Sequence, residues 1–145
     1  MSVDLKITNL KAFNKKLNKT LKDNKVKEYV TRGTMMVMNT AKQSIAKGGT
    51  GQLYEKYEPR RSHRASAPNE PPATDTGFLI SQITMKVKAH KNGVVEGSII
   101  SAAPYSKALE YGTTQMTERP FMQPALQKNK RKIQRLFKKG IIKWA

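Results

Sequence analysis

The chain has 145 residues, with 28 Lys and Arg against 10 Asp and Glu, which gives a formal net charge of +18 at pH 7. This length suits one domain, so we expect residues 1–145 to fold as a single domain. Hydrophobic residues make up 37% of the chain, below the roughly 45–50% usual in globular domains, which predicts a long loop or arm. The absence of cysteine excludes disulfides, thiolate metal ligands and a cysteine nucleophile.

The positive charge indicates attraction to a polyanion, which is nucleic acid, an anionic membrane or an acidic protein surface, unless it only reflects a lysine-rich, solvated surface. No run of apolar residues approaches the ~20 that a membrane helix needs. The N-terminus also lacks the apolar stretch of a signal peptide. We therefore expect a protein that is made and used in a cytoplasm and has no membrane partner.

Two helices are predicted between residues 8 and 46. In the first, Leu10, Phe13 and Leu17 recur at helical spacing with lysines between them. A break is expected at Asp23-Asn24, and a second apolar stripe then continues to Ile45. Gly48-Gly49 is expected to end this helix.

Residues 47–73 are rich in proline and glycine and predict a long loop or arm without regular structure. The stretch contains a short basic cluster, Arg60, Arg61 and Arg64, which are candidates to contact DNA or an acidic partner. In an assembly protein, such an arm orders against a neighbouring subunit.

Regular structure is predicted to resume after Thr74. Asp75 or Thr76 is a candidate cap for a short helix through Ile83. Alternating polar and apolar residues then predict a β-hairpin over about 84–102, with strands 84–90 and 94–102 around an Asn-Gly turn. Gly97 is a candidate bulge.

The C-terminal part of the chain predicts two more helices. Pro104 is expected to open a short helix that ends at Gly112. Pro120 is expected to open a basic helix over about 120–139, with its apolar stripe on Leu126, Ile133 and Phe137. The basic residues proposed to meet DNA or an acidic partner on this helix are Lys128, Arg131, Lys132, Arg135, Lys138 and Lys139. The predicted fold class is thus α+β: long N-terminal helices, a small antiparallel sheet and a C-terminal helix.

No catalytic set emerges from the sequence. His63 and His90 belong to no zinc-binding pattern. The acids are few and scattered, whereas metal-dependent nucleases need clustered carboxylates. We therefore expect a protein that is not an enzyme and takes no cofactor or metal. Sequence-independent nucleic-acid binding through phosphate contacts is the main alternative function, because the basic residues match no known base-reading motif.

Three segments resemble one family of tailed-phage neck or tail-completion proteins, typified by gene product ten of phage Hong Kong 97. The first is Thr76-Gly77 followed by Leu79, and the second runs from Tyr105 through Glu110 to Gly112-Thr113. The third begins at Met116 and continues as Arg119-Pro120-Phe121 to Pro124. Together the matches cover roughly residues 25–137, in the order expected for the family. Ser106 and Leu109 depart mildly from its pattern.

The resemblance implies a structural virion protein that forms an oligomeric ring between the DNA-filled head and the tail. Its implied partners are copies of itself, a connector or head-closure protein, a tail-terminator or tail-tube protein, and phage DNA in the channel. Its implied location is the virion, after assembly in the host cytoplasm. We expect the first helix to dock on protein and the terminal helix to lie near DNA.

Physical roles can be assigned to some motif residues. Gly112 is expected to adopt a positive φ after its helix. Glu110 is expected either to accept hydrogen bonds from loop amides, to pair with Arg119, or to remain a solvated carboxylate. Phe121 is expected to anchor the start of the last helix in the core.

Overall fold

The computed structural model describes residues 1–5, 23–57, 60–90 and 94–142 of the chain. Its fold is α+β, as predicted. The elements, in chain order, are β1 (Ser2–Leu5), α2 (Asp23–Ala46), β2 (Leu53–Tyr57), β3 (Arg60–Arg64), α3 (Phe78–Ser81), β4 (Ile83–Ala89), β5 (Val95–Ser101), α4 (Ser106–Tyr111) and α5 (Met122–Ile142).

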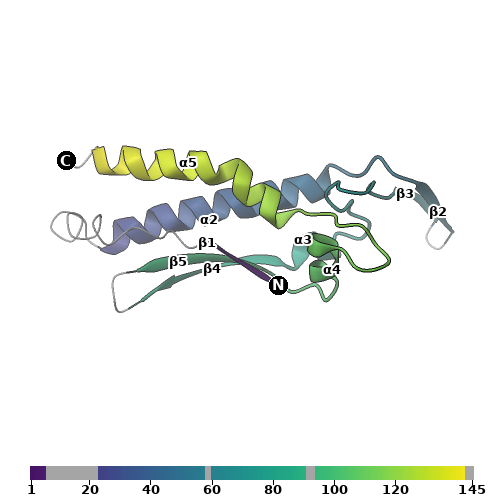
Figure 1. Ribbon diagram of the computed structural model, residues 1–145, viewed down its shortest axis with the longest axis horizontal. Helices are drawn as coiled ribbons and strands as arrows, with labels where there is room; N and C mark the ends of the chain where they lie inside the picture. The colour runs from purple at the N-terminus through teal and green to yellow at the C-terminus, as the bar shows by residue number, and fades with distance from the viewer. Residues whose placement is uncertain (6–22, 58–59, 91–93, 143–145) are drawn as a thin grey trace.

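The body of the molecule has three layers (Figure 1). A three-stranded antiparallel sheet of order β1-β5-β4 forms one side. Helix α2 lies against this sheet, and α5 packs on the opposite side of α2. The strands β2 and β3 form a separate antiparallel hairpin that projects from one end of the body. Helix α2 thus covers one face of the sheet, and α5 covers α2.

The core lies between α2, the sheet and the first half of α5. Helix α2 buries its apolar stripe because Val30, Val37, Ala41 and Ile45 recur every three to four residues or at a multiple of that spacing, and so share one face. The sheet contributes Ile83 and Ile99, and α5 contributes Phe121, Met122, Ala125 and Ile133. Most helical stability in such a fold comes from this packing rather than from local propensity.

Gly97 allows α2 to approach the sheet closely. It is buried on β5 and pairs in regular register with Val87 on one side and Leu5 on the other. A Cβ atom added at Gly97 would collide with the Thr34 hydroxyl and contact Val30 of α2. The predicted bulge at this glycine is therefore wrong, because what requires glycine is the close packing of the helix.

The polar contact between the two long helices involves Asn129. This side chain is buried on α5, and its Nδ2 donates to Thr40 Oγ1 of α2 and to the Ala125 carbonyl, each at 2.8 Å. Further along, the rings of Tyr29 and Phe137 lie 5.9 Å apart. A satisfied buried amide of this kind stabilises one particular alignment of two helices, because a shift would leave it unpaired.

The predictions for the helices and the β-hairpin are largely confirmed. Strands β4 and β5 lie within a residue of the predicted 84–90 and 94–102. The second N-terminal helix is α2, and Gly48 follows its end with φ 82°. The C-terminal helix runs two to three residues later than the predicted 120–139. The first predicted helix and the Asn-Gly turn lie outside the described residues.

One further prediction is corrected, and one strand was not predicted. Residues 47–73 are not a loop throughout, because β2 and β3 pair within them from Leu53↔Arg64 to Tyr57↔Arg60. The prolines did not prevent this pairing, since none of them lies within β2 or β3. Strand β1 was not predicted, because four residues are too few to show an alternating pattern. Its partner is β5, about a hundred residues away in the chain.

The close approach at Gly97 gives a first prediction. The change Gly97→Ala should lower the free energy of unfolding by about 1–3 kcal/mol, because the new methyl group would push α2 away from the sheet. Urea denaturation followed by circular dichroism measures this. Ser98→Ala, on the other side of the sheet at the next position of β5, is the matched control and should change little. An unchanged midpoint for Gly97→Ala would contradict the packing role.

Candidate assembly site

Glu110 joins the second and third segments of the family resemblance. Its carboxylate is 2% exposed and accepts three backbone hydrogen bonds, from Phe121 at 2.9 Å, Met122 at 3.0 Å and Gln123 at 2.8 Å. These amides open helix α5. Since the first amides of a helix have no partner within it and carry partial positive charge, a buried carboxylate suits this position.

Pro124 completes this cap. It is the next residue in the first turn of α5, where a fourth amide would otherwise need an acceptor. Proline has no N–H, so nothing is left unsatisfied at this position. Glu110 and Pro124 together account for all four amides at the start of the helix. The expectation that Glu110 accepts amide hydrogen bonds is confirmed, and the solvated carboxylate is excluded.

The loop between α4 and α5 is held in one conformation by backbone contacts. Gly112 has φ 71° and ψ −178°, a combination that is essentially restricted to glycine. An added Cβ would lie 2.9 Å from the Met116 carbonyl oxygen and 3.0 Å from the Glu118 nitrogen. Thr113 N–H donates to the Met116 carbonyl at 2.8 Å, and Arg119 N–H donates to the Leu109 carbonyl at 2.6 Å. The positive φ predicted for Gly112 is confirmed.

The Thr76-Gly77 segment opens helix α3. Gly77, with φ 79°, is the N-cap residue, and Thr76 Oγ1 accepts a hydrogen bond from Phe78 N–H at 3.3 Å. The helix is shorter than predicted and does not use Asp75 as its cap. Leu79, the next motif residue, is buried in the core. The motif thus turns the chain and anchors it, as expected for scaffold.

Phe121 and Tyr105 occupy different environments. Phe121 is among the most buried side chains and anchors the start of α5, as predicted. Pro120 lies just before α5 rather than at its first position. Tyr105 is the N-cap residue of α4, and its ring is 43% exposed and lies 6.3 Å from the ring of Phe78. The hydroxyls of Ser101 and Ser106, both buried, hydrogen-bond at 2.5 Å and fix α4 to the end of β5.

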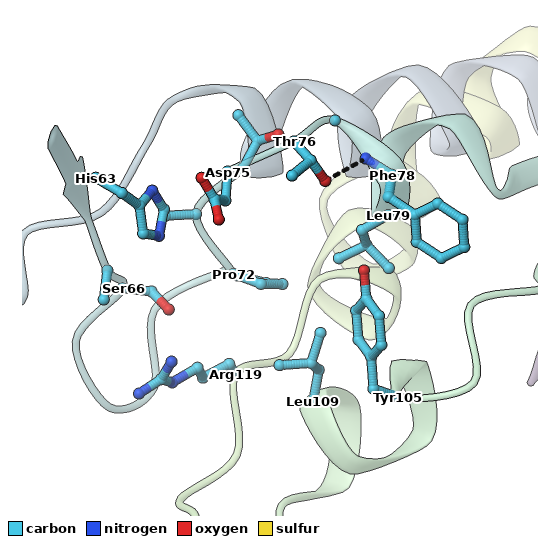
Figure 2. Close-up of a pocket in the computed structure, with 14 residues that line it drawn as sticks. His63, Ser66, Pro72, Asp75, Thr76, Phe78, Leu79, Tyr105, Leu109 and Arg119 are labelled. Carbon is cyan, nitrogen blue, oxygen red and sulfur yellow. Dashed lines mark hydrogen bonds between the residues drawn. The ribbon is translucent and has the colours of Figure 1, made fainter. Parts of the chain in front are cut away.

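A pocket of about 250 Å³ lies where all three motif segments meet, and we call it the Arg119 pocket (Figure 2). Figure 2 shows Leu109 and Tyr105 on one side, His63 and Asp75 on the other, and Arg119 at the base. The remaining lining residues are Ala65, Ser66, Pro72, Ala73, Thr74, Thr76, Gly77, Phe78 and Leu79. The sequence did not indicate this pocket, since its walls come from two separate segments, 63–79 and 105–119.

The side chain of Arg119 has no hydrogen bond or ion pair with any residue of the described part of the chain. Its Nε is buried without an acceptor. The ion pair with Glu110, one of the three environments expected for that carboxylate, does not form, because the carboxylate accepts from the α5 amides. A partly buried guanidinium without an acceptor is costly. Arg119 is therefore the motif residue that the isolated chain leaves unsatisfied.

The basic residues of the β2–β3 hairpin each make a different contact. Arg61 pairs with Asp75 at 3.1 Å, and Lys56 also pairs with this carboxylate. Arg64 donates to the Gly51 carbonyl at 3.2 Å, while Arg60 pairs through its backbone with Tyr57. The hydrogen bond from Lys56, together with the charges of Arg61 and His63, holds the pKa of Asp75 below its ordinary value. Asp75 thus fastens the hairpin to the body, a role that the sequence did not indicate.

The predicted basic face of α5 is exposed. Lys128, Arg131, Lys132, Arg135, Lys138 and Lys139 all point to solvent. In the described part of the chain, none of these six residues forms an ion pair with an acid. The apolar stripe opposite them packs against α2, so packing orients the basic face outward.

Among the described residues, no group of three or more His, Asp or Glu side chains lies close enough to hold a metal ion. None of the helices within those residues is long and apolar enough to cross a bilayer. No family model, curated protein or solved structure matches this chain.

The Glu110 cap gives a second prediction. The change Glu110→Ala should lower the free energy of unfolding by about 3–5 kcal/mol, because it leaves two buried amides and one partly buried amide without acceptors. Glu110→Gln keeps one acceptor oxygen and should cost less. Chemical denaturation measures both changes. Equal losses for the two variants would contradict the hydrogen-bonding role.

The Asp75 contacts give a third prediction, on pH. Because the pKa of Asp75 is lowered in the folded protein, its contribution is present above the ordinary value of 3.8 and is lost as the pH falls through the lowered pKa. Amide exchange in β2 and β3, measured relative to β5, should therefore rise at acidic pH. In Asp75→Asn this relative exchange should be raised already at neutral pH and should respond less to acid. An unchanged profile would argue against the Asp75 contact.

Proposed function

We propose that this chain is a structural subunit of a tailed-phage head–tail junction, a neck or tail-completion protein that forms an oligomeric ring. The observation that carries the proposal is the Glu110 cap. It joins the Tyr105–Thr113 and Arg119–Pro124 segments, on which the family resemblance depends, through three hydrogen bonds to one buried carboxylate. Residues selected for catalysis would converge on a reactive group, whereas these residues fix the direction of a helix.

The shape of the subunit supports an assembly role. A projecting hairpin lies at one end of the body, and two long helices lie along it (Figure 1). Large apolar side chains are exposed on the hairpin (Leu53, Tyr54 and Tyr57), in the wall of the Arg119 pocket (Phe78 and Tyr105) and at the end of α4 (Tyr111). Exposed tyrosine and phenylalanine are typical of protein–protein interfaces. The proposed partners are other copies, a connector or head-closure protein, and a tail-terminator or tail-tube protein.

The basic face of α5 supports the proposed location of the subunit beside phage DNA in the channel. Six exposed Lys and Arg side chains on one helix suit loose contact with phosphates, as a channel through which DNA slides requires. The same face favours the alternative function, a freestanding protein that binds nucleic acid without sequence preference. The two functions differ in whether the chain assembles.

Light scattering after size exclusion tests the proposal. The purified chain, alone or mixed with connector and tail-tube proteins encoded beside it, should give the mass of a ring or of a mixed complex. Gly112→Ala, which strains the loop before Arg119, should weaken the assembly. Ser98→Ala serves as the matched control. A monomer that ignores these partners would contradict the proposal.

The charge reversals Lys132→Glu and Arg135→Glu distinguish the alternative function, a freestanding nucleic-acid-binding protein, from the ring subunit. If the chain is a freestanding nucleic-acid binder, the wild type should remain a monomer and bind duplex DNA tightly, with affinity that falls steeply as salt rises. Each reversal should then flatten that salt dependence by about one phosphate contact. For a ring subunit we expect modest DNA affinity and assembly that the two reversals leave intact.

A further inference from the structure

The Arg119 pocket has a polar side and an apolar side. Figure 2 shows the Arg119 guanidinium and the Ser66 hydroxyl on the same side of the pocket, away from Phe78 and Tyr105. The rings of Phe78 and Tyr105, together with the side chain of Leu109, form the apolar side. A ligand that fills this pocket therefore needs a polar group joined to an apolar one.

Two groups on the polar side have no partner in the described part of the chain. Ser66 is 4% exposed, and Figure 2 shows its hydroxyl directed into the pocket. This hydroxyl forms no hydrogen bond with another described residue. The Arg119 side chain also lacks an acceptor there, and its Nε is buried. Because burial of unpaired polar groups costs free energy, a ligand that hydrogen-bonds to the Ser66 hydroxyl and to the guanidinium would lower that cost.

Backbone contacts join the two segments that carry these groups. Asn69 N–H donates to the Glu118 carbonyl at 3.0 Å, which connects the loop after Ser66 to the loop between α4 and α5. Within the first of these loops, the Glu70 carboxylate accepts from Ala67 N–H at 2.9 Å. The polar side is thus already formed in the chain by itself, so a ligand has less ordering cost to overcome.

The acids that line or adjoin the pocket make other contacts. Asp75 is paired with Lys56 and Arg61, and Glu110 accepts from the amides of α5. In the described part of the chain, the guanidinium of Arg119 forms no ion pair. Two cations compensate the charge of Asp75, whereas no acid compensates the charge of Arg119. The pocket therefore suits a ligand with a single negative charge.

We propose that the Arg119 pocket binds a carboxylate that is attached to an apolar group. The carboxylate accepts from the Arg119 guanidinium and from the Ser66 hydroxyl, and the apolar group packs against Leu109 and Tyr105. A planar guanidinium presents parallel N–H donors that match the two oxygens of a carboxylate. A phosphate dianion fits less well, because its second charge would face Asp75 with no second free cation.

The volume of the pocket limits the size of the ligand. At about 250 Å³ it is smaller than the roughly 300–1,000 Å³ of sites for drug-sized molecules. Either a small organic acid or an acidic side chain beside an apolar residue of another protein has the required groups at this size. All the lining residues belong to one chain, so binding does not depend on whether the chain assembles into a ring.

Titration of the full chain with matched probes, followed by NMR spectroscopy of the isotopically labelled protein, tests the proposal. Phenylacetate should bind with a roughly millimolar Kd and should shift the Nε–Hε signal of Arg119. Phenylacetamide, which lacks the charge, should bind at least about 10-fold more weakly. Inorganic phosphate, which lacks the apolar group, should leave the Arg119 signal in place. A phosphate affinity equal to that of phenylacetate, read from this signal, would overturn the assignment.

Substitutions in the polar side give a second measurement. Arg119→Gln should weaken phenylacetate binding about 10-fold or more, and Ser66→Ala about 2- to 10-fold. Arg32→Gln removes the same charge from an exposed position on α2 and should change nothing. Ser66→Ala leaves Arg119 in place, so it remains informative if Arg119→Gln fails to fold. Unchanged affinity in Ser66→Ala and Arg119→Gln would show that the carboxylate binds elsewhere.

A blocked peptide distinguishes the two sources of the carboxylate. If acetyl-Leu-Glu-Leu-amide binds more tightly than phenylacetate, and its Leu-Gln-Leu counterpart does not bind, an acidic segment of another protein is the better ligand. If phenylacetate binds more tightly, the ligand is a free organic acid. If neither probe shifts the Arg119 signal at millimolar concentration, the pocket is not a carboxylate site.

Discussion

The buried carboxylate of Glu110 determines where helix α5 begins and in which direction it points. Three amides of the first turn donate to it, and Pro124 removes the need for a fourth acceptor. Helix α5 packs along α2, and α2 covers the sheet. The arrangement of all three layers therefore depends on where this one carboxylate lies. The same interaction orients the basic face of α5 and leaves Arg119 without its expected partner.

This constraint explains why the family-like segments contain scaffold residues rather than reactive ones. Gly112 adopts a conformation that only glycine tolerates well, and Phe121 is buried at the start of α5. Each supports the path of the chain between α4 and α5. Arg119 differs from them, since its backbone is fixed by the Leu109 carbonyl while its guanidinium faces the pocket without an acceptor.

Contacts made on folding also decide which basic residues are paired with an acid and which are not. On the hairpin, Arg61 and Lys56 form ion pairs with Asp75. They hold the hairpin to the body and are not free to bind a polyanion. On α5, no acid in the described part of the chain neutralises the exposed Lys and Arg side chains. The net charge therefore predicted unpaired surface cations correctly for α5, but not for Lys56 and Arg61 of the hairpin. Which positive charges remain available is decided by the acids that folding brings beside them.

The sequence by itself determined the α+β class, the hairpin β4–β5, helix α2 and the positive φ of Gly112, because each depends on periodicity or turn chemistry within a few residues. It did not determine β1 or the β2–β3 hairpin, whose short strands carry weak patterns and, for β1, pair with a partner far away in the chain. Nor could it choose among the three environments expected for Glu110. Only the tertiary structure places this carboxylate under the amides of α5 and brings His63, Leu79 and Arg119 around one pocket, because those contacts join segments that are distant in sequence.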